Sequence, residues 1–125
     1  MIGNRFCVVF ISTASAIICA AAPASASRYD GNWSMTAVTT RGHCGTVPMS
    51  MAISGGRIFA TGGSFAFYQI RLGGHVNNSG GARIRAVAGP RVARGAGRFT
   101  PTSARGTWNG SGPSGLCSGY WTATR

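Results

Sequence analysis

The stretch Val47-Pro48-Met49-Ser50-Met51-Ala52-Ile53 most clearly indicates the fold of this chain. Its larger apolar residues occupy alternate positions, so they share one face of an extended strand, while small and polar residues share the other. Pro48 lies near the start of the stretch, where a strand tolerates a residue that cannot donate a backbone hydrogen bond. The stretch therefore predicts a β-strand with one buried face.

The rest of the chain from Trp33 onward has the same character. Short β-type runs alternate with clusters of Gly, Pro, Asn and Ser, and no apolar period of 3.6 residues persists for the length of a helix. The connections are short, so consecutive strands are expected to be antiparallel neighbours. Eight strands are predicted, at residues 32–40, 47–53, 57–61, 65–76 (with a bend at Gly73-Gly74), 82–88, 91–100, 104–110 and 117–124.

Residues 1–26 have the pattern of a secretory signal peptide. Arg5 supplies a positive start, residues 6–22 are apolar, and Ala24-Ser25-Ala26 is a cleavage site of small residues. An uncleaved anchor is disfavoured because the apolar run is short and contains Ser and Thr. We expect cleavage after Ala26, a single β-domain at residues 27–125, and a soluble periplasmic or secreted protein that is not transmembrane after cleavage.

Cleavage leaves two cysteines, Cys44 and Cys117. A pair of cysteines in an exported chain most simply forms a disulfide. A metal site or a catalytic thiol would need partners, but His43 and His75 are the only histidines and no C-x-x-C is present. The sequence therefore predicts a Cys44–Cys117 disulfide and no metal site.

The motif G-x-W-[S/N/T] occurs three times, at residues 31–34, 106–109 and 119–122, and it contains all three tryptophans. One copy lies in the first predicted strand and two lie in the last two. A sheet that closes on itself would bring these strands together, and would also place Cys44 beside Cys117. An all-β, up-and-down barrel of about eight strands is expected, with a β-sandwich as the alternative. An outer-membrane barrel is disfavoured, since Arg83 and Arg85 interrupt any lipid-like face.

The charge balance is extreme. The chain has 12 basic residues, all of them arginine, against one acid, Asp30. A single carboxylate excludes glycosidase acid pairs, aspartic dyads, carboxylate-bridged metals and calcium loops. No G-x-S-x-G or other nucleophile pattern is present. We expect no catalytic residues, no cofactor and no enzymatic activity.

A hairpin at residues 82–100 carries much of the positive charge. Strand alternation places Arg83 and Arg85 on one face of its first strand, and Arg94 and Arg98 on one face of its second. If these faces coincide, they form an anion-binding surface, with Arg71, Arg91 and Arg105 at its margins. The other interpretation is that these arginines are solvated surface residues without a specific partner, and that their number reflects a GC-rich genome. No specific nucleic-acid motif accompanies the arginines.

The aromatic residues support two further interpretations. They can fill the core of a barrel whose strands are rich in Gly and Ala, or they can line a pocket at its mouth. The tryptophans Trp33, Trp108 and Trp121 are the main candidates in either case, joined by Phe65, Phe67, Tyr68 and Tyr120.

Residues at both ends of the domain carry a family resemblance. The segments Tyr29-Asp30-Gly31-Asn32-Trp33-Ser34, Gly42-His43-Cys44, Arg105-Gly106-Thr107-Trp108 and Cys117-Ser118-Gly119-Tyr120-Trp121 resemble uncharacterised, Gly-rich, small exported proteins of rhizobial-type Gram-negative bacteria. This resemblance implies a bacterial source and a periplasmic or secreted location, and no activity. A looser similarity to exported protease-inhibitor barrels rests on the early G-x-W and the disulfide.

Together these observations predict a non-enzymatic exported β-domain whose arginine hairpin binds an anionic polymer or envelope surface. The alternative is a barrel that binds a small hydrophobic ligand or a protease. The sequence does not indicate an oligomeric state.

Overall fold

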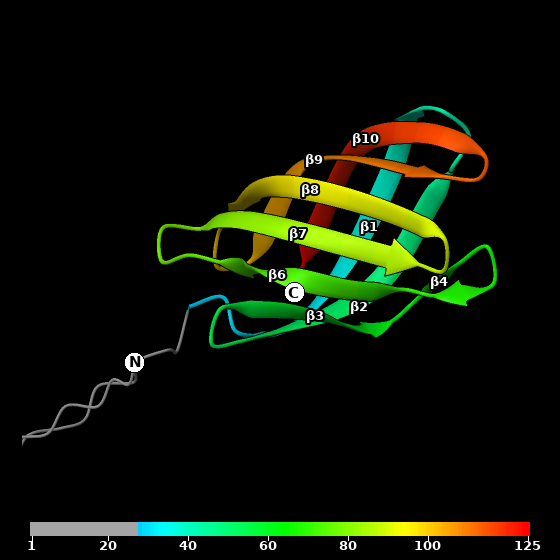
Figure 1. Cartoon of the computed structure of the whole chain (residues 1–125). Coiled ribbons are helices and arrows are strands. Elements are labelled where there is room, and N and C mark those ends of the chain that lie inside the picture. Colours follow the sequence, from blue (N-terminus) through cyan, green and yellow to red (C-terminus); the bar gives the residue numbers. More distant parts are fainter. Residues whose placement is uncertain (1–27) are drawn as a thin grey trace, which may run out of the picture.

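The computed structural model describes residues 28–125, so the predicted signal peptide at residues 1–26 lies outside the described residues. Eight strands of this region form a closed antiparallel barrel (Figure 1). Each barrel strand pairs with the next along the chain, and the last pairs with the first. The barrel, rather than a sandwich, is therefore the fold. Its strands are β1 (Gly31–Arg41), β2 (Thr46–Ser54), β3 (Arg57–Gly62), β6 (Arg71–Val76), β7 (Gly81–Ala88), β8 (Arg91–Phe99), β9 (Ser103–Gly112) and β10 (Gly115–Thr124).

The predicted single strand at residues 65–76 is wrong. A small hairpin, β4 (Ser64–Phe65) and β5 (Tyr68–Gln69), precedes β6. The hairpin turns at Ala66 and Phe67, both at positive φ (53° and 74°), which Gly and Asn normally supply. Because neither residue is a typical turn former, the sequence carries no local signal for this turn. The expected bend at Gly73-Gly74 lies within the continuous strand β6.

The three strands that carry G-x-W lie side by side in the order β1, β10, β9, as predicted. Within them, aromatic residues face glycines: Trp121 pairs with Gly106, and Trp108 with Gly119. A Cβ at Gly106 would lie 2.7 Å from Trp121 Nε1, and one at Gly97 on β8 would lie 2.6 Å from Trp121 Cζ2. The indole of Trp121 therefore spreads across two neighbouring strands, because both have glycine there.

One end of the barrel, which we call the closed end, is filled by aromatic side chains. The Phe99 ring lies 4.9 Å from Trp33 and 6.0 Å from Trp121, centroid to centroid, and 5.9 Å from Tyr29. Trp33 Nε1 donates a hydrogen bond to the Tyr29 carbonyl (2.8 Å), so this buried donor is satisfied. The Arg125 guanidinium stacks on Trp33 at 4.9 Å. These contacts fill the interior of the barrel at this end.

Asp30 also lies at the closed end. Its carboxylate accepts hydrogen bonds from the backbone N–H groups of Gly55 (2.8 Å) and Gly56 (3.1 Å), which form the β2–β3 turn. The only acid of the chain therefore ties the first strand to a turn. Among residues 28–125, no helix is long and apolar enough to cross a membrane.

Candidate ligand-binding cavity and arginine-rich face

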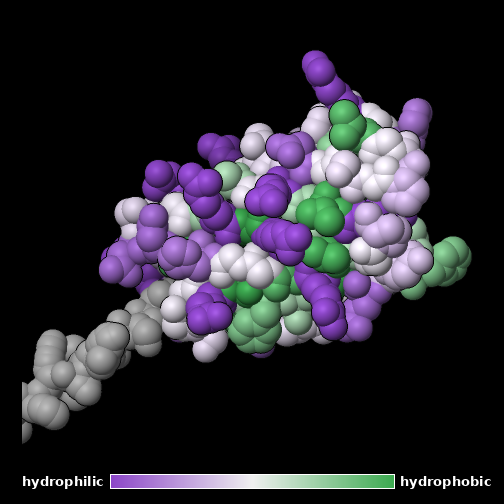
Figure 2. Space-filling view, in the orientation of Figure 1, coloured by the Kyte–Doolittle hydropathy of each residue, from purple (hydrophilic) through white to green (hydrophobic). Residues whose placement is uncertain are grey.

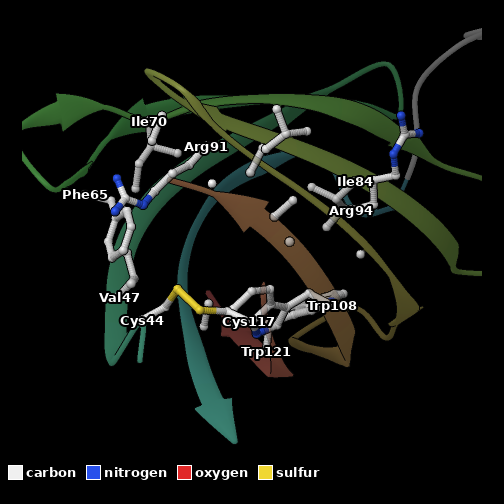
Figure 3. A pocket seen from close by; sticks show the side chains of 18 of the residues that line it. Cys44, Val47, Phe65, Ile70, Ile84, Arg91, Arg94, Trp108, Cys117 and Trp121 are labelled. Carbon is white, nitrogen blue, oxygen red and sulfur yellow. A yellow bond between two sulfur atoms is a disulfide. The ribbon is translucent and has the colours of Figure 1, made fainter. Parts of the chain in front are cut away.

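The opposite end of the barrel, the open end, contains a cavity of about 120 Å³ (Figure 3). It lies between the disulfide, the indoles of Trp108 and Trp121, and the inner faces of β6, β7 and β8. Its walls are almost entirely apolar. The side chains that enclose it include Met35, Val47, Met49, Phe65, Ile70, Leu72, Ile84, Trp108 and Trp121.

The cavity exists because the inner residues of β7 and β8 are small there. Ala86 and Ala88 line it from β7, and Ala93 and Gly95 line it from β8. In the closed half, the same inner face of β8 carries Phe99, which fills the barrel. Along the inner face of β8, the side chains therefore change from aromatic at the closed end to small at the open end. The closed half of the barrel is packed, and the open half contains the cavity.

Arg91 stands at the mouth of this cavity. It pairs with buried Ala88, so its side chain belongs to the inner face of β8. The guanidinium lies 5.0 Å from the centre of the Phe65 ring, and Nη2 donates a hydrogen bond to Ser114 Oγ (3.2 Å). A Cβ at Gly112 would lie 2.4 Å from Arg91 Cγ, so glycine leaves room for the arginine stem. Arg91 is thus an inward-facing cation at the edge of an apolar cavity.

The disulfide between Cys44 and Cys117 is present, as predicted. It joins the β1–β2 connection to the start of β10 across 73 residues of sequence. Both cysteines line the cavity. The covalent link therefore joins the wall of the barrel at the open end, where the interior is not filled.

The four arginines of the predicted patch share the outer face of the barrel. Arg85 lies directly opposite Arg94 in the β7–β8 register, and Arg98 lies opposite Arg105 in the β8–β9 register. Arg83 is also exposed on this face. Figure 2 shows hydrophilic side chains gathered over this part of the surface. The two predicted arginine faces therefore coincide.

The margins of the patch differ from the prediction at one position. Arg105 adjoins it on β9, and Arg71 pairs with Val87 on the outer face. Arg91 does not belong to it, because it lies three residues before Arg94 and so faces inward. Strict period-two counting along β8 would have identified this difference, and with it the cation at the cavity mouth.

The aromatic candidates divide between core, cavity and surface. Trp33 is buried in the closed end, whereas Trp121 and half-buried Trp108 line the cavity. Trp108 Nε1 donates to the carbonyls of Val38 and Tyr120, both at 3.2 Å. Phe65 lines the cavity, and the Tyr68 ring lies against Gly89. Phe67 and Tyr120 are exposed on the outside.

Neither histidine lines the cavity. His43 is exposed beside the disulfide, and His75 is exposed on β6 opposite Arg83. Within the described part of the chain, no three His, Cys, Asp or Glu residues are grouped so as to hold a metal ion.

Comparison of the chain with protein-family models, with curated proteins and with solved structures finds no match. The arguments about function therefore rest on the geometry of the cavity and of the arginine face.

Proposed function

We propose that the barrel binds a small amphiphile, with its apolar part in the cavity and its anionic group at Arg91. The observation that carries this proposal is an open, apolar cavity with an inward-facing guanidinium at its mouth. A closed apolar cavity of about 150 Å³ can hold benzene. A space of about 120 Å³ therefore suits a small ring or a short alkyl chain, and the open mouth lets a longer ligand extend outward.

Arg91 suits an anionic group because a guanidinium has five N–H donors. One of them is used by Ser114 Oγ, and no cavity-lining residue is an acid. A carboxylate placed there would gain charge-assisted hydrogen bonds, which contribute about 1.5–3 kcal/mol each when a partner is charged. The proposal is for binding without catalysis, since the sole acid lies at the closed end and neither histidine lines the cavity.

The disulfide fits an oxidising compartment outside the cytoplasm. With the signal-peptide pattern of residues 1–26, it supports our proposal that the protein acts in the periplasm or after secretion.

Calorimetric titration of the purified protein with octanoate and with 1-octanol tests the cavity proposal. We expect both to bind saturably, and octanoate to bind more tightly. Arg91→Met should weaken octanoate binding by about tenfold or more, because it removes the charged partner. The same variant should leave octanol binding nearly unchanged.

Arg57→Met is the matched control, since Arg57 is exposed on β3 and does not line the cavity. It removes the same charge and should leave both affinities unchanged. Absence of saturable binding for both ligands contradicts the proposal. Equal loss of octanoate affinity in both variants would show that Arg91 has no specific role in binding the carboxylate.

A second proposal concerns the outer surface: the arginine face of β7, β8 and β9 binds an anionic partner. It is supported by the opposed pairs Arg85–Arg94 and Arg98–Arg105, with no acid on these strands. Facing cations repel each other, and an anion relieves that repulsion.

Retention on immobilised dextran sulfate across a salt gradient tests this second proposal. Replacing Arg83, Arg85, Arg94 and Arg98 with Ser should shift elution to lower salt. Two matched double variants compare the face with the rest of the surface: Arg85→Ser with Arg94→Ser removes two charges from the face, and Arg28→Ser with Arg57→Ser removes two from outside it. Equal elution of the two double variants would show that only net charge matters and would contradict the proposal.

A further inference from the structure

The tip of the β4–β5 hairpin presents a phenylalanine to solvent at the open end. Phe67 is fully exposed and has φ of 74°, a conformation that bulky side chains rarely adopt. The residues around it are anchored: the Phe65 ring lies beneath Arg91, and the Tyr68 ring packs on Gly89. The hairpin is therefore held against the barrel while Phe67 extends beyond it.

The outer face of the barrel is also apolar next to this end. The strand registers place Val87, Val92, Ser111 and Leu116 in one outward-facing row, which continues to Arg71 on β6. Leu116 is 78% exposed, and it belongs to the same end of the barrel as exposed Phe67; several exposed apolar residues together mark an interaction surface more clearly than one alone. We call Phe67, Val87, Val92 and Leu116 the apolar rim. In Figure 2, hydrophobic atoms project at the end of the molecule where β4 lies.

A row of cations lies directly behind the rim. The next outward-facing positions of the same strands are Arg85, Arg94, Asn109 and Ser118, and the row continues to Arg41 on β1. Same-face positions on a strand are roughly 7 Å apart, so the cations follow the rim at that distance. A surface hollow lined by Arg41, Arg94, Val92 and Leu116 connects the two rows. We call Arg41, Arg85 and Arg94 the collar.

We propose that the open end docks on the surface of an anionic phospholipid bilayer. Phe67 and Leu116 enter the interfacial region, and the collar binds lipid phosphates. This inference deepens the second proposal, on which it rests, by naming the anionic partner. It does not depend on a ligand in the cavity.

Charge and apolar surface together favour a bilayer over a soluble anionic polymer. A polymer would neutralise the collar but has no apolar layer to receive Phe67 and Leu116, whereas a bilayer offers both at adjacent depths. The only acid of the chain, Asp30, lies at the opposite end, so nothing at the open end repels anionic headgroups. Docking in this orientation places the cavity mouth at the lipid surface.

Cosedimentation with vesicles of phosphatidylcholine containing phosphatidylglycerol tests the inference. We expect binding that falls with salt and is much weaker on pure phosphatidylcholine. Phe67→Asn should weaken binding at least about tenfold, because it removes one exposed aromatic ring from the interface. Asn adopts positive φ more readily than Phe, so the hairpin turn is kept.

Two matched variants test the orientation. Arg85→Ser with Arg94→Ser removes the collar pair and should weaken vesicle binding roughly thirtyfold, at about fivefold for each charge near the surface. Arg98→Ser with Arg105→Ser removes an equivalent facing pair near the closed end and should have a much smaller effect. Phe59→Ser, at an exposed phenylalanine on β3, is the apolar control.

The results separate this inference from the proposal on which it rests. Retention on dextran sulfate without vesicle binding, or wild-type vesicle binding by Phe67→Asn, would overturn membrane docking and leave anion binding by the face intact. Equal losses from the two arginine pairs would also overturn it, because docking through the rim requires the collar pair to matter more.

Discussion

The two ends of the barrel are built from the same eight strands but have opposite interiors. At the closed end, Phe99 meets three aromatic rings, and Arg125 stacks on Trp33. At the open end, alanines and glycines of β7 and β8 leave about 120 Å³ unfilled, and a disulfide connects the wall. The difference teaches that stability is concentrated at one end, which leaves the other end free for binding.

The largest expected effect comes from removing the aromatic centre of the closed end. Phe99→Ala should lower the free energy of unfolding by about 3–5 kcal/mol, because it leaves a cavity among rings that cannot collapse. Leu72→Ala, at a half-buried residue beside the existing cavity, should cost less than about 2 kcal/mol. Urea denaturation of the two variants measures the contrast, and equal losses would contradict it.

The disulfide is the next test, because it substitutes for packing at the open end. Cys44→Ser with Cys117→Ser should destabilise the protein by about 2–4 kcal/mol, since the bridge closes a long loop. Calorimetric melting in the absence of reductant measures this effect. Octanoate affinity should fall as well, while near-ultraviolet circular dichroism from the closed-end aromatics persists. Loss of that aromatic signal together with the affinity would show that the two ends are not independent.

These effects also indicate how far the sequence predicts the structure. Alternation at Val47–Ile53, the three G-x-W motifs and the cysteine pair were enough to predict the barrel, the order of its last strands and the disulfide. The β4–β5 turn was missed because Ala66 and Phe67 adopt φ values that their residue types do not signal. Tertiary contacts of Phe65 and Tyr68 hold that turn instead.

The arginine face followed from alternation, but the cavity did not. A cavity depends on the summed volumes of side chains from several strands, and no local pattern reports that sum. The small inner residues Ala86, Ala88, Ala93 and Gly95 were visible in the sequence, yet only the strand register shows that they lie together on one wall of the barrel. Likewise, the sequence does not show which aromatic residues fill the core and which line the cavity, because that depends on how deep each one lies in the barrel.

Two glycines on the inner face of β8 test where along this strand the packed half of the barrel ends. A Cβ at Gly97 would lie 2.2 Å from the Arg105 carbonyl oxygen and 2.6 Å from Trp121, whereas one at Gly95 would meet its nearest atoms at 3.2 Å or more. Gly97→Ala should therefore cost about 1–3 kcal/mol through overpacking, and Gly95→Ala less than about 1 kcal/mol. Thermal unfolding of the pair decides whether the packed half ends between these residues.

The smallest expected effect is a gain in stability at the open end. Phe67→Gly should stabilise the protein by about 1 kcal/mol, because glycine adopts positive φ without the steric cost that Phe incurs. Chemical denaturation measures the change. Unchanged or lower stability would mean that the exposed ring contributes to folding rather than to an interface.

The most direct test of the central claim, that the open end is a binding site, fills the cavity. Ala93 lines it from β8, and Ala96 is exposed on the outer face of the same strand. Calorimetric titration with octanoate should show binding to the wild-type protein and to Ala96→Leu, and a loss of at least about tenfold in Ala93→Leu while its barrel remains folded by circular dichroism. Wild-type affinity in folded Ala93→Leu would contradict the claim.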